Sequence, residues 1–236
     1  MGDWKISTNP DYTEKNGQRT NVAEKITRGI GSILVHPNYT ATNQPGESVD
    51  GETQRNDIAL IRLNESVPLY QDDSTQSFAN PICLPWSDYL EDNHPARNIK
   101  NFKNDKKDRT EMVVTGWGKT KEKQSVQDVL DNSVFVDILQ RAKVPVTNDI
   151  PNCAAFKTDS TQICAGGIKG PNGKYEGKDS CHADSGGPLH IRDLSDDPWY
   201  QTGIVSFGSG CGRLNAPGIY TNVNSFLPWI KETLED

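Results

Sequence analysis

Residues 177–189, GKDSCHADSGGPL, contain the residue types that could carry out covalent chemistry. Ser185 follows an acidic residue, Asp184, and precedes a pair of glycines. A serine hydroxyl is a weak nucleophile that attacks a carbonyl only when a neighbouring base takes its proton. A serine between Asp and Gly also fits an ordinary turn. A catalytic role for Ser185 therefore requires a base, a group that orients this base, and elements that hold all three together.

The composition of the 236-residue chain excludes several classes of protein. Hydrophobic residues make up 33%, the mean hydropathy is −0.70, and the 20 glycines and 14 prolines predict many turns. The net charge of −7 argues against nucleic acid and anionic membranes as partners, because both require clustered positive charge. No apolar run approaches the roughly 20 residues that span a bilayer. We expect a loop-rich β protein with neither a nucleic-acid nor a membrane partner.

The cysteines and sequons point to an oxidising compartment. Five cysteines are spaced as if for disulfides, and N-x-Ser/Thr sequons make Asn38 and Asn64 candidates for glycosylation. The first 20 residues are polar and do not resemble a signal peptide. We therefore expect the export signal of a secreted parent protein to lie upstream of Met1. A cytosolic protein with chance sequons is the alternative.

Short β-like runs separated by turn signals recur along the chain, which is typical of an antiparallel barrel. The runs are GSILVHP, DIALIRL, EMVVTGWG, SVFVDILQ, TQICAGG, WYQTGIVSFG and PGIYTNV. Both alternating faces of DIALIRL are largely apolar, so this strand is predicted to be buried between two layers. Residues 88–111 are charge-rich without periodicity, which predicts a surface loop or a linker between two halves.

The C-terminal residues predict a helix that docks on the β body. Ser225 is placed to cap its first turn. The apolar residues that follow recur at the spacing of one helical face: Phe226, Trp229, Ile230 and Leu234.

Six strings, considered together, resemble the trypsin-like (chymotrypsin-family) serine endopeptidases. They are NDIALIRL around Asp57, VTGWG (114–118), ICAGG (163–167), DSCHADSGGPL around Ser185, VSFGSGCG (205–212) and PGIYTNV (217–223). The early stretch GDWKISTNPDY is similar to arthropod clip-domain proteases of immune and developmental cascades. The resemblance implies an all-β fold, a double antiparallel β-barrel with a C-terminal α-helix.

The resemblance also implies the domain organisation. A single peptidase domain would cover residues 1–236, with a partial first barrel and linker in 1–112 and the second barrel and helix in 113–236. The first barrel should need about six strands, and the chain begins after the first two or so. We therefore expect an incomplete first barrel with unpaired edges, as from a truncated transcript.

The resemblance assigns roles to individual residues. Ser185 would attack the scissile carbonyl, and Asp57 would orient a histidine that takes the serine proton. The backbone at Ala183 and Ser185 would form the oxyanion hole. Asp184 would pair with the amino terminus that zymogen cleavage frees. Ala183 departs from the family, which has glycine there, because a Cβ opposes positive φ at a cost on the order of 1 kcal/mol.

A specificity pocket follows from the same resemblance. Asp179 falls where trypsin-like enzymes keep a carboxylate at the pocket floor, and a buried carboxylate there requires an Arg or Lys side chain of the substrate. The other pocket positions are Ser206, Gly208 and Gly218, and the two glycines leave the pocket open. We expect no cofactor and no metal site, because the acidic stretch ESVDGETQRND lacks the oxygen ligands of a calcium loop.

The resemblance implies two disulfides in the second barrel, Cys153 with Cys164 and Cys181 with Cys211. Cys83 is left over. In the family this cysteine often links the protease to its propeptide or light chain. A buried free thiol is the alternative.

The general-base histidine is missing from its expected place. In this family the order is His, Asp, Ser, and the histidine lies in a segment resembling Ala-Ala-His-Cys. Only His36 precedes Asp57, and it lies in a string that the family uses as a strand end. His94, His182 and His190 are interpreted as surface or packing residues. An Ile-Val-Gly-Gly-like activation start is also absent.

Two functions remain open. The parent protein is predicted to be a secreted, extracellular serine endopeptidase that acts on protein substrates and meets serpin-type inhibitors. The alternative is a non-catalytic protease homologue that binds partners in an extracellular cascade, which Ala183 and the missing histidine favour. Under either hypothesis, hydrolysis by this chain alone should be negligible, because a serine without its base is not activated.

Overall fold

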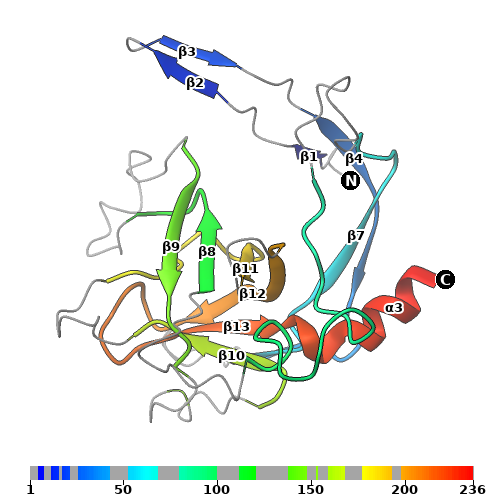
Figure 1. The fold of residues 1–236 in the computed structure, drawn as a ribbon, viewed down its shortest axis with the longest axis vertical. Coiled ribbons are helices and arrows are strands. Elements are labelled where there is room, and N and C mark those ends of the chain that lie inside the picture. The colour runs from blue at the N-terminus through cyan, green and yellow to red at the C-terminus, as the bar shows by residue number, and fades with distance from the viewer. Residues whose placement is uncertain are drawn as a thin grey trace. The chain divides into compact units, whose positions relative to one another are not determined.

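The structure is a computed structural model that describes residues 5–7, 12–15, 18–21, 26–42, 53–68, 80–99, 112–120, 138–147, 153, 159–167, 177–192 and 198–235. The chain divides into two compact units, coloured along the chain in Figure 1. Unit 1 comprises Met1–His36 and Ala59–Ile82. Unit 2 comprises Pro37–Ile58 and Cys83–Asp236. The described residues are mostly β-strand, and no helix among them is long and apolar enough to cross a membrane.

Unit 1 contains an open antiparallel sheet and a hairpin. The sheet has the order β1-β4-β7, and β2 pairs with β3. The bounds are β1 (Lys5–Ser7), β2 (Tyr12–Lys15), β3 (Gln18–Asn21), β4 (Thr27–Val35) and β7 (Ala59–Leu63). The described strands of this unit do not close into a barrel, so the expected incomplete first barrel is confirmed.

The prediction that DIALIRL is buried on both faces is wrong. The run does form β7, and Ile61 pairs with Ile33 of β4. However, 47% of the Ile61 surface and 55% of the Ile33 surface is exposed. The reason is that no second layer covers this pair of strands in the described part of unit 1.

Unit 2 is built on a closed six-stranded antiparallel barrel. Its sheet order is β10-β13-β12-β11-β8-β9. The bounds are β8 (Met112–Gly116), β9 (Gln140–Val144), β10 (Gln162–Ala165), β11 (Pro188–Ile191), β12 (Tyr200–Gly208) and β13 (Gly218–Asn222). Just beyond β9, Val146 bridges to Ala165 of β10, and the N–H of Gly166 donates to the carbonyl of Pro145 at 2.8 Å. This bridge joins the two ends of the sheet, which gives the barrel expected for the second half.

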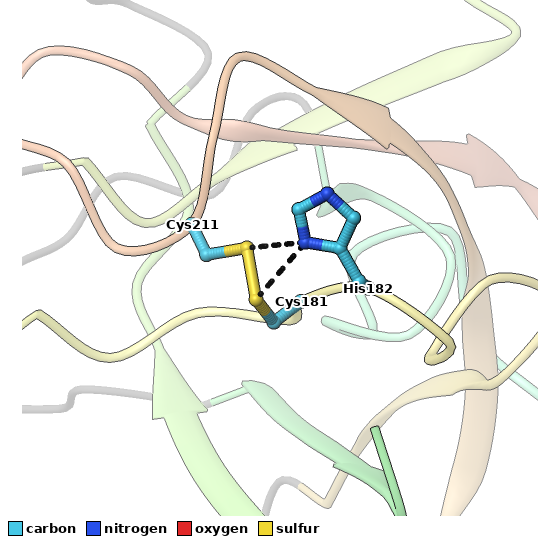
Figure 2. A group of neighbouring side chains, drawn as sticks. All are labelled: Cys181, His182 and Cys211. Atoms are coloured by element: carbon cyan, nitrogen blue, oxygen red, sulfur yellow. Dashed lines mark hydrogen bonds between the residues drawn. A yellow bond between two sulfur atoms is a disulfide. The ribbon is translucent and has the colours of Figure 1, made fainter. Parts of the chain in front are cut away.

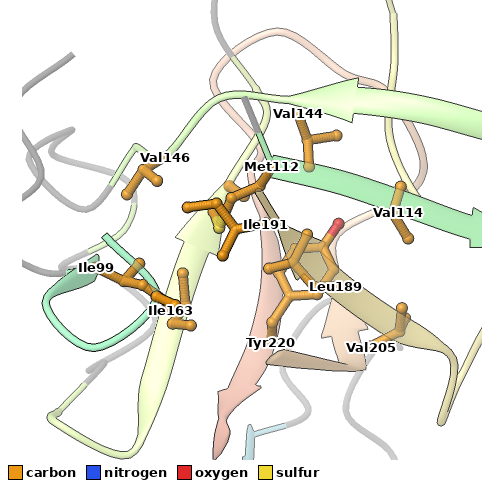
Figure 3. Close-up of a cluster of buried hydrophobic side chains, with 12 residues drawn as sticks. Ile99, Met112, Val114, Val144, Val146, Ile163, Leu189, Ile191, Val205 and Tyr220 are labelled. Carbon is orange, nitrogen blue, oxygen red and sulfur yellow. The ribbon is translucent and has the colours of Figure 1, made fainter. Parts of the chain in front are cut away.

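Alternate residues of these strands fill the barrel interior, as Figure 3 shows. Leu189 and Ile191 lie two positions apart on β11, and Met112 and Val114 lie two apart on β8; all are at most 3% exposed. Ala96 and Ile99, from the stretch predicted as a surface loop, also belong to the buried residues of this unit. That prediction was therefore wrong for these two side chains; residues 100–111 lie outside the described residues.

The C-terminal helix is confirmed, with a different beginning and with one residue of the expected apolar face exposed. A 3₁₀ helix, η4 (Val223–Phe226), precedes α3 (Leu227–Glu235). Ser225 lies inside η4 and donates its hydroxyl to the carbonyl of Ser160, so it does not cap α3. Phe226 and Ile230 are buried as expected, and Leu227 is buried as well, whereas Leu234 lies in the last turn and is 67% exposed.

The described residues include only the end of the run SVFVDILQ. Its residues 133–137 lie outside the described residues, and β9 begins at its last residue, Gln140.

Candidate functional site

Ser185 lies on a tight turn that is attached to the barrel wall. The N–H of Asp184 donates to the carbonyl of Cys181 at 3.0 Å, and the N–H of Gly187 donates to the carbonyl of Asp184 at 2.8 Å. The N–H of Gly186 donates to the carbonyl of Val205 in β12 at 2.9 Å. Ser185 is exposed, so its hydroxyl is accessible on a rigidly bonded turn.

Asp57 is held by β12, the strand that binds the turn of Ser185, and by the neighbouring strand β13. Its Oδ2 accepts a hydrogen bond from the Ser206 hydroxyl at 2.6 Å, and its carbonyl accepts one from the Thr221 hydroxyl at 2.7 Å. Ser206 directly follows Val205, whose carbonyl holds the turn of Ser185. Adjacent residues of β12 therefore fix both the candidate nucleophile and the candidate orienting acid.

The hairpin before Asp57 is also attached to the barrel of unit 2. It consists of β5 (Thr40–Thr42) and β6 (Thr53–Arg55). The side-chain amide of Gln162 in β10 donates to the carbonyl of Gln54 at 2.8 Å, and Arg55 forms an ion pair with Asp159. These contacts keep Asp57 beside the barrel although it lies far from Ser206 in the sequence.

Ala183, in the candidate oxyanion hole, has a left-handed backbone conformation. Its φ is 73°, and Gly186 in the same turn has a φ of 80°. The turn thus has the conformation that glycine adopts without strain, while Ala183 carries a Cβ that opposes it.

Asp184 has backbone partners on both carboxylate oxygens. Oδ1 accepts from the N–H of Gly118 and Oδ2 from the N–H of Cys181, each at 2.9 Å. A Cβ on Gly116 would lie 1.9 Å from Asp184 Oδ1, and one on Gly118 would lie 2.5 Å from it. The two glycines of the TGWG string therefore make room for this carboxylate. In the described ranges no ion pair involves Asp184.

Asp179 is a half-buried carboxylate that receives hydrogen bonds from the backbone. Its Oδ1 accepts from the N–H of Ser180 at 2.8 Å, and its Oδ2 accepts from the N–H of Gly212 at 2.9 Å. Burial raises the pKa of Asp179 from 3.8 to about 6, because these N–H groups compensate only partly for the lost hydration. A cationic ligand would supply the missing compensation.

The predicted pocket glycines lie next to this carboxylate. Gly218 of β13 pairs with Gly208 of β12. A Cβ on Gly218 would lie 3.0 Å from Asp179 Oδ1, which is closer than ordinary packing allows. The structure therefore brings Asp179 and Gly218 together, with Gly208 paired to Gly218. Ser206, the other predicted pocket residue, donates its hydroxyl to Asp57.

Tyr220 contacts the loop that carries Asp179, and no motif in the sequence marks it as a site residue. Its hydroxyl lies 3.2 Å from the Ser180 hydroxyl, and its side chain is fully buried. Burial raises the pKa of Tyr220 well above its ordinary value of 10, so the phenol stays neutral.

A cavity of about 310 Å³ borders both carboxylates of this region, Asp179 and Asp184. Lys119, Arg141 and Lys178 also line it. Basic and acidic groups thus share one polar cavity within unit 2.

The disulfides are those that the resemblance implied. Cys153 pairs with Cys164 and Cys181 pairs with Cys211. Cys83 is a half-buried free thiol whose backbone is held between Trp199 and Gln201, by bonds of 3.1 and 2.9 Å. Its link to another chain stays a prediction.

The four histidines of the chain lie in four different surroundings. His94 accepts a hydrogen bond from the N–H of Ala96 at 3.1 Å and packs edge-on against Tyr200. His190 lies in β11 against Trp199, and burial lowers its pKa. His182 is exposed beside the Cys181–Cys211 disulfide, and His36 follows β4 in unit 1.

Both sequon residues are on the surface. Asn38 is exposed in the turn after β4, and Asn64 is exposed directly after β7. Their glycosylation stays a prediction.

A closed barrel in which one strand holds both a serine turn and an aspartate by hydrogen bonds is the arrangement of a chymotrypsin-type serine protease. The family named Trypsin matches residues 6–230, so the chain belongs to the trypsin family of serine proteases.

Insect proteases are among its similar relatives. The chain is 33% identical to "CLIP domain-containing serine protease HP8" of Bombyx mori, with 100% of the chain and 53% of that protein aligned. It is 33% identical to "CLIP domain-containing serine protease B4" of Anopheles gambiae, over 99% of the chain and 53% of that protein. It is 35% identical to "Melanization protease 1" of Drosophila melanogaster, over 99% of the chain and 50% of that protein. The chain spans about half the length of these relatives.

Replacing Ala183 by glycine should stabilise the protein. The substitution Ala183→Gly removes the Cβ that opposes a φ of 73°, so we expect the free energy of unfolding in urea to rise by about 0.5–1 kcal/mol. As a control, Ala142→Gly in the regular strand β9 should lower it by about 0.5–1 kcal/mol. Equal losses in the two variants would show that the turn does not strain Ala183.

Proposed function

We propose that this chain is the peptidase part of a secreted endopeptidase that cleaves proteins after Arg or Lys. The observation that carries the proposal is Asp179, a half-buried carboxylate with two backbone donors and a raised pKa. Among protein side chains, guanidinium and ammonium groups are those that stabilise such a carboxylate by charge. Gly218, which pairs with Gly208, lacks the Cβ that would crowd this carboxylate, and in this proposal the two glycines border the long side chain of the substrate.

In this proposal Ser185 is the nucleophile and Asp57 orients the base. The hydroxyl of Ser206 fixes one oxygen of Asp57, which leaves the other to receive an imidazole N–H. The N–H groups of Ala183 and Ser185 would receive the oxyanion, and Asp184 would stabilise the turn that presents them. No histidine of the chain is assigned as the base, since the four lie in other motifs. The chain alone should therefore be nearly inactive.

A non-catalytic homologue that binds partners in an extracellular cascade is the second candidate. Ala183, with a φ of 73°, is the observation that favours it, because a family member selected for turnover gains from glycine at this turn. Such a protein would keep the pocket for recognition and lose hydrolysis.

The proposed partners follow from the same assignment. Protein substrates would place an Arg or Lys side chain in the pocket at Asp179, and serpin-type inhibitors would place the same type of side chain there. A light chain or propeptide would bind covalently through Cys83, the thiol left over by the two disulfides. Those two disulfides also support an extracellular location.

Binding of benzamidine, a small aromatic cation, should depend on the ionisation of Asp179. The cation binds the carboxylate and not the neutral acid, so affinity falls as Asp179 takes up its proton below pH 6. With a pKa of about 6, we expect binding to be roughly tenfold weaker at pH 5 than at pH 7, measured by calorimetry.

Two variants separate this effect from a general response to pH. Asp179→Asn should bind weakly and independently of pH. Asp92→Asn, in which an exposed acid paired with Arg97 is replaced, should bind benzamidine with the same pH dependence as the unsubstituted chain. Unchanged binding in Asp179→Asn would mean that the pocket floor has been misplaced.

Labelling by a fluorophosphonate should require an added base. We expect no reaction of the present chain, but rapid reaction at Ser185 in a longer, activated chain that adds an upstream segment with an Ala-Ala-His-Cys motif. The longer chain should also hydrolyse an arginyl ester. Ser185→Ala in that chain should abolish both reactions.

Two other outcomes would change the proposal. A longer chain that binds benzamidine but neither labels nor hydrolyses would support the non-catalytic homologue. Labelling of the present chain at a rate similar to trypsin's, lost in His36→Ala, would assign His36 as the base and overturn our interpretation of the N-terminal residues.

A further inference from the structure

Three side chains that could bind a metal meet beside the candidate pocket. The imidazole Nδ1 of His182 lies 3.6 Å from Cys181 Sγ and 3.5 Å from Cys211 Sγ, as Figure 2 shows. Each residue offers one ligand atom, and the three atoms lie within 4.8 Å of one another. In the part of the chain that the structure describes, this is the single such group. Here the two sulfurs form a disulfide, so they have no thiolate to offer.

Backbone contacts hold the two cysteines near each other without help from the disulfide. In the turn of Cys181, the N–H of Asp184 donates to the carbonyl of Cys181, and the N–H of Cys181 donates to Oδ2 of Asp184. The carbonyl of His182 accepts from the N–H of Lys119 at 2.9 Å. On the other side, the N–H of Gly212, next to Cys211, donates to Asp179 at 2.9 Å. None of these hydrogen bonds involves a sulfur atom.

We propose that reduction of the Cys181–Cys211 disulfide creates a Zn²⁺ site made of Cys181, His182 and Cys211. Two thiolates and one imidazole are a known ligand set for zinc with a fourth position left for water. Zn–S bonds of about 2.3 Å and Zn–N bonds of about 2 Å keep the ligand atoms within about 4 Å of one another. Nδ1 already lies within this distance of both sulfurs, and the two sulfurs, bonded to each other in the disulfide, must separate to about 4 Å after reduction. The exposure of His182 leaves the fourth position open to solvent.

The reaction balances with a dithiol as the reductant. The dithiol transfers two electrons and two protons to the disulfide, which becomes two thiols while the dithiol becomes a cyclic disulfide. Zn²⁺ then replaces the two thiol protons, which are released to solvent. The imidazole would bind the metal through the Nδ1 lone pair.

The second disulfide provides an internal comparison. Cys153 and Cys164 are at most 1% exposed and pack with Ile219 and Phe207. They are not members of a three-ligand group among the described residues. Reduction of that disulfide should therefore not create a comparable zinc site. The proposal does not depend on the proposed peptidase activity, since it concerns the metal affinity of the reduced chain.

The experiment titrates the reduced chain with Co²⁺ and then with Zn²⁺. Dithiothreitol reduces the protein in a Cys83→Ser background and is then removed under argon, and near-UV circular dichroism follows the fold. We expect one Co²⁺ per chain, with thiolate-to-cobalt charge-transfer bands that Zn²⁺ abolishes. His182→Gln should weaken binding at least tenfold, and the oxidised chain should give no such bands.

Alkylation locates the metal on the chain. With Zn²⁺ bound, mass spectrometry should show that iodoacetamide modifies Cys181 and Cys211 much more slowly, while Cys153 and Cys164 react as they do without metal. Equal affinity in His182→Gln, or protection of Cys153 and Cys164 instead, would overturn the proposal. A reduced chain that unfolds would give the first of these results, so loss of the fold also counts against it.

Discussion

The carboxylate of Asp179 is buried in unit 2 and accepts hydrogen bonds from two backbone N–H groups, and a glycine, a tyrosine and a disulfide of this unit lie beside it or beside its donors. Gly218 of β13 has no side chain at the point where one would contact this carboxylate. Tyr220, two residues later on the same strand, contacts the adjacent Ser180. The Cys181–Cys211 disulfide links the two segments that supply the backbone donors. A carboxylate buried this way is costly without a cation.

A second carboxylate, Asp184, organises the turn of Ser185. Its oxygens accept hydrogen bonds from the N–H groups of Gly118 and Cys181. Gly116, the last residue of β8, and Gly118 have no side chains and so leave the space that the carboxylate occupies. The turn is therefore determined by backbone hydrogen bonds, and Ala183 adopts the left-handed conformation that these bonds impose. Strain at such a position persists only where the surroundings fix the backbone, and it is common at functional sites.

The motifs predicted the barrel of unit 2 and the positions of Asp179, Gly208 and Gly218, because these residues lie in strings with characteristic spacing. Contacts between distant segments could not be predicted from one sequence. The hydrogen bond from Ser206 to Asp57 joins residues 149 positions apart, and nothing local marks either partner. The close approach of Gly116 to Asp184 could not be predicted either, because these residues are also far apart in the sequence.

Burial was the other quantity that the pattern could not predict. The alternation in DIALIRL predicted the strand but not that Ile61 would be exposed, since exposure depends on which layers cover a strand. The helix pattern likewise predicted α3 and the burial of Phe226 and Ile230, but not that Leu234 would be exposed in the last turn.

The pKa of Asp179 tests the central claim most directly, because the claim concerns the energy of this one buried charge. Carbon-13 NMR of labelled aspartate carboxyl groups would follow the titration, with Asp179→Asn identifying the signal. We predict a midpoint near 6 in the unliganded protein, which falls when benzamidine binds. A midpoint near the ordinary value of 3.8 that does not respond to benzamidine would contradict the claim.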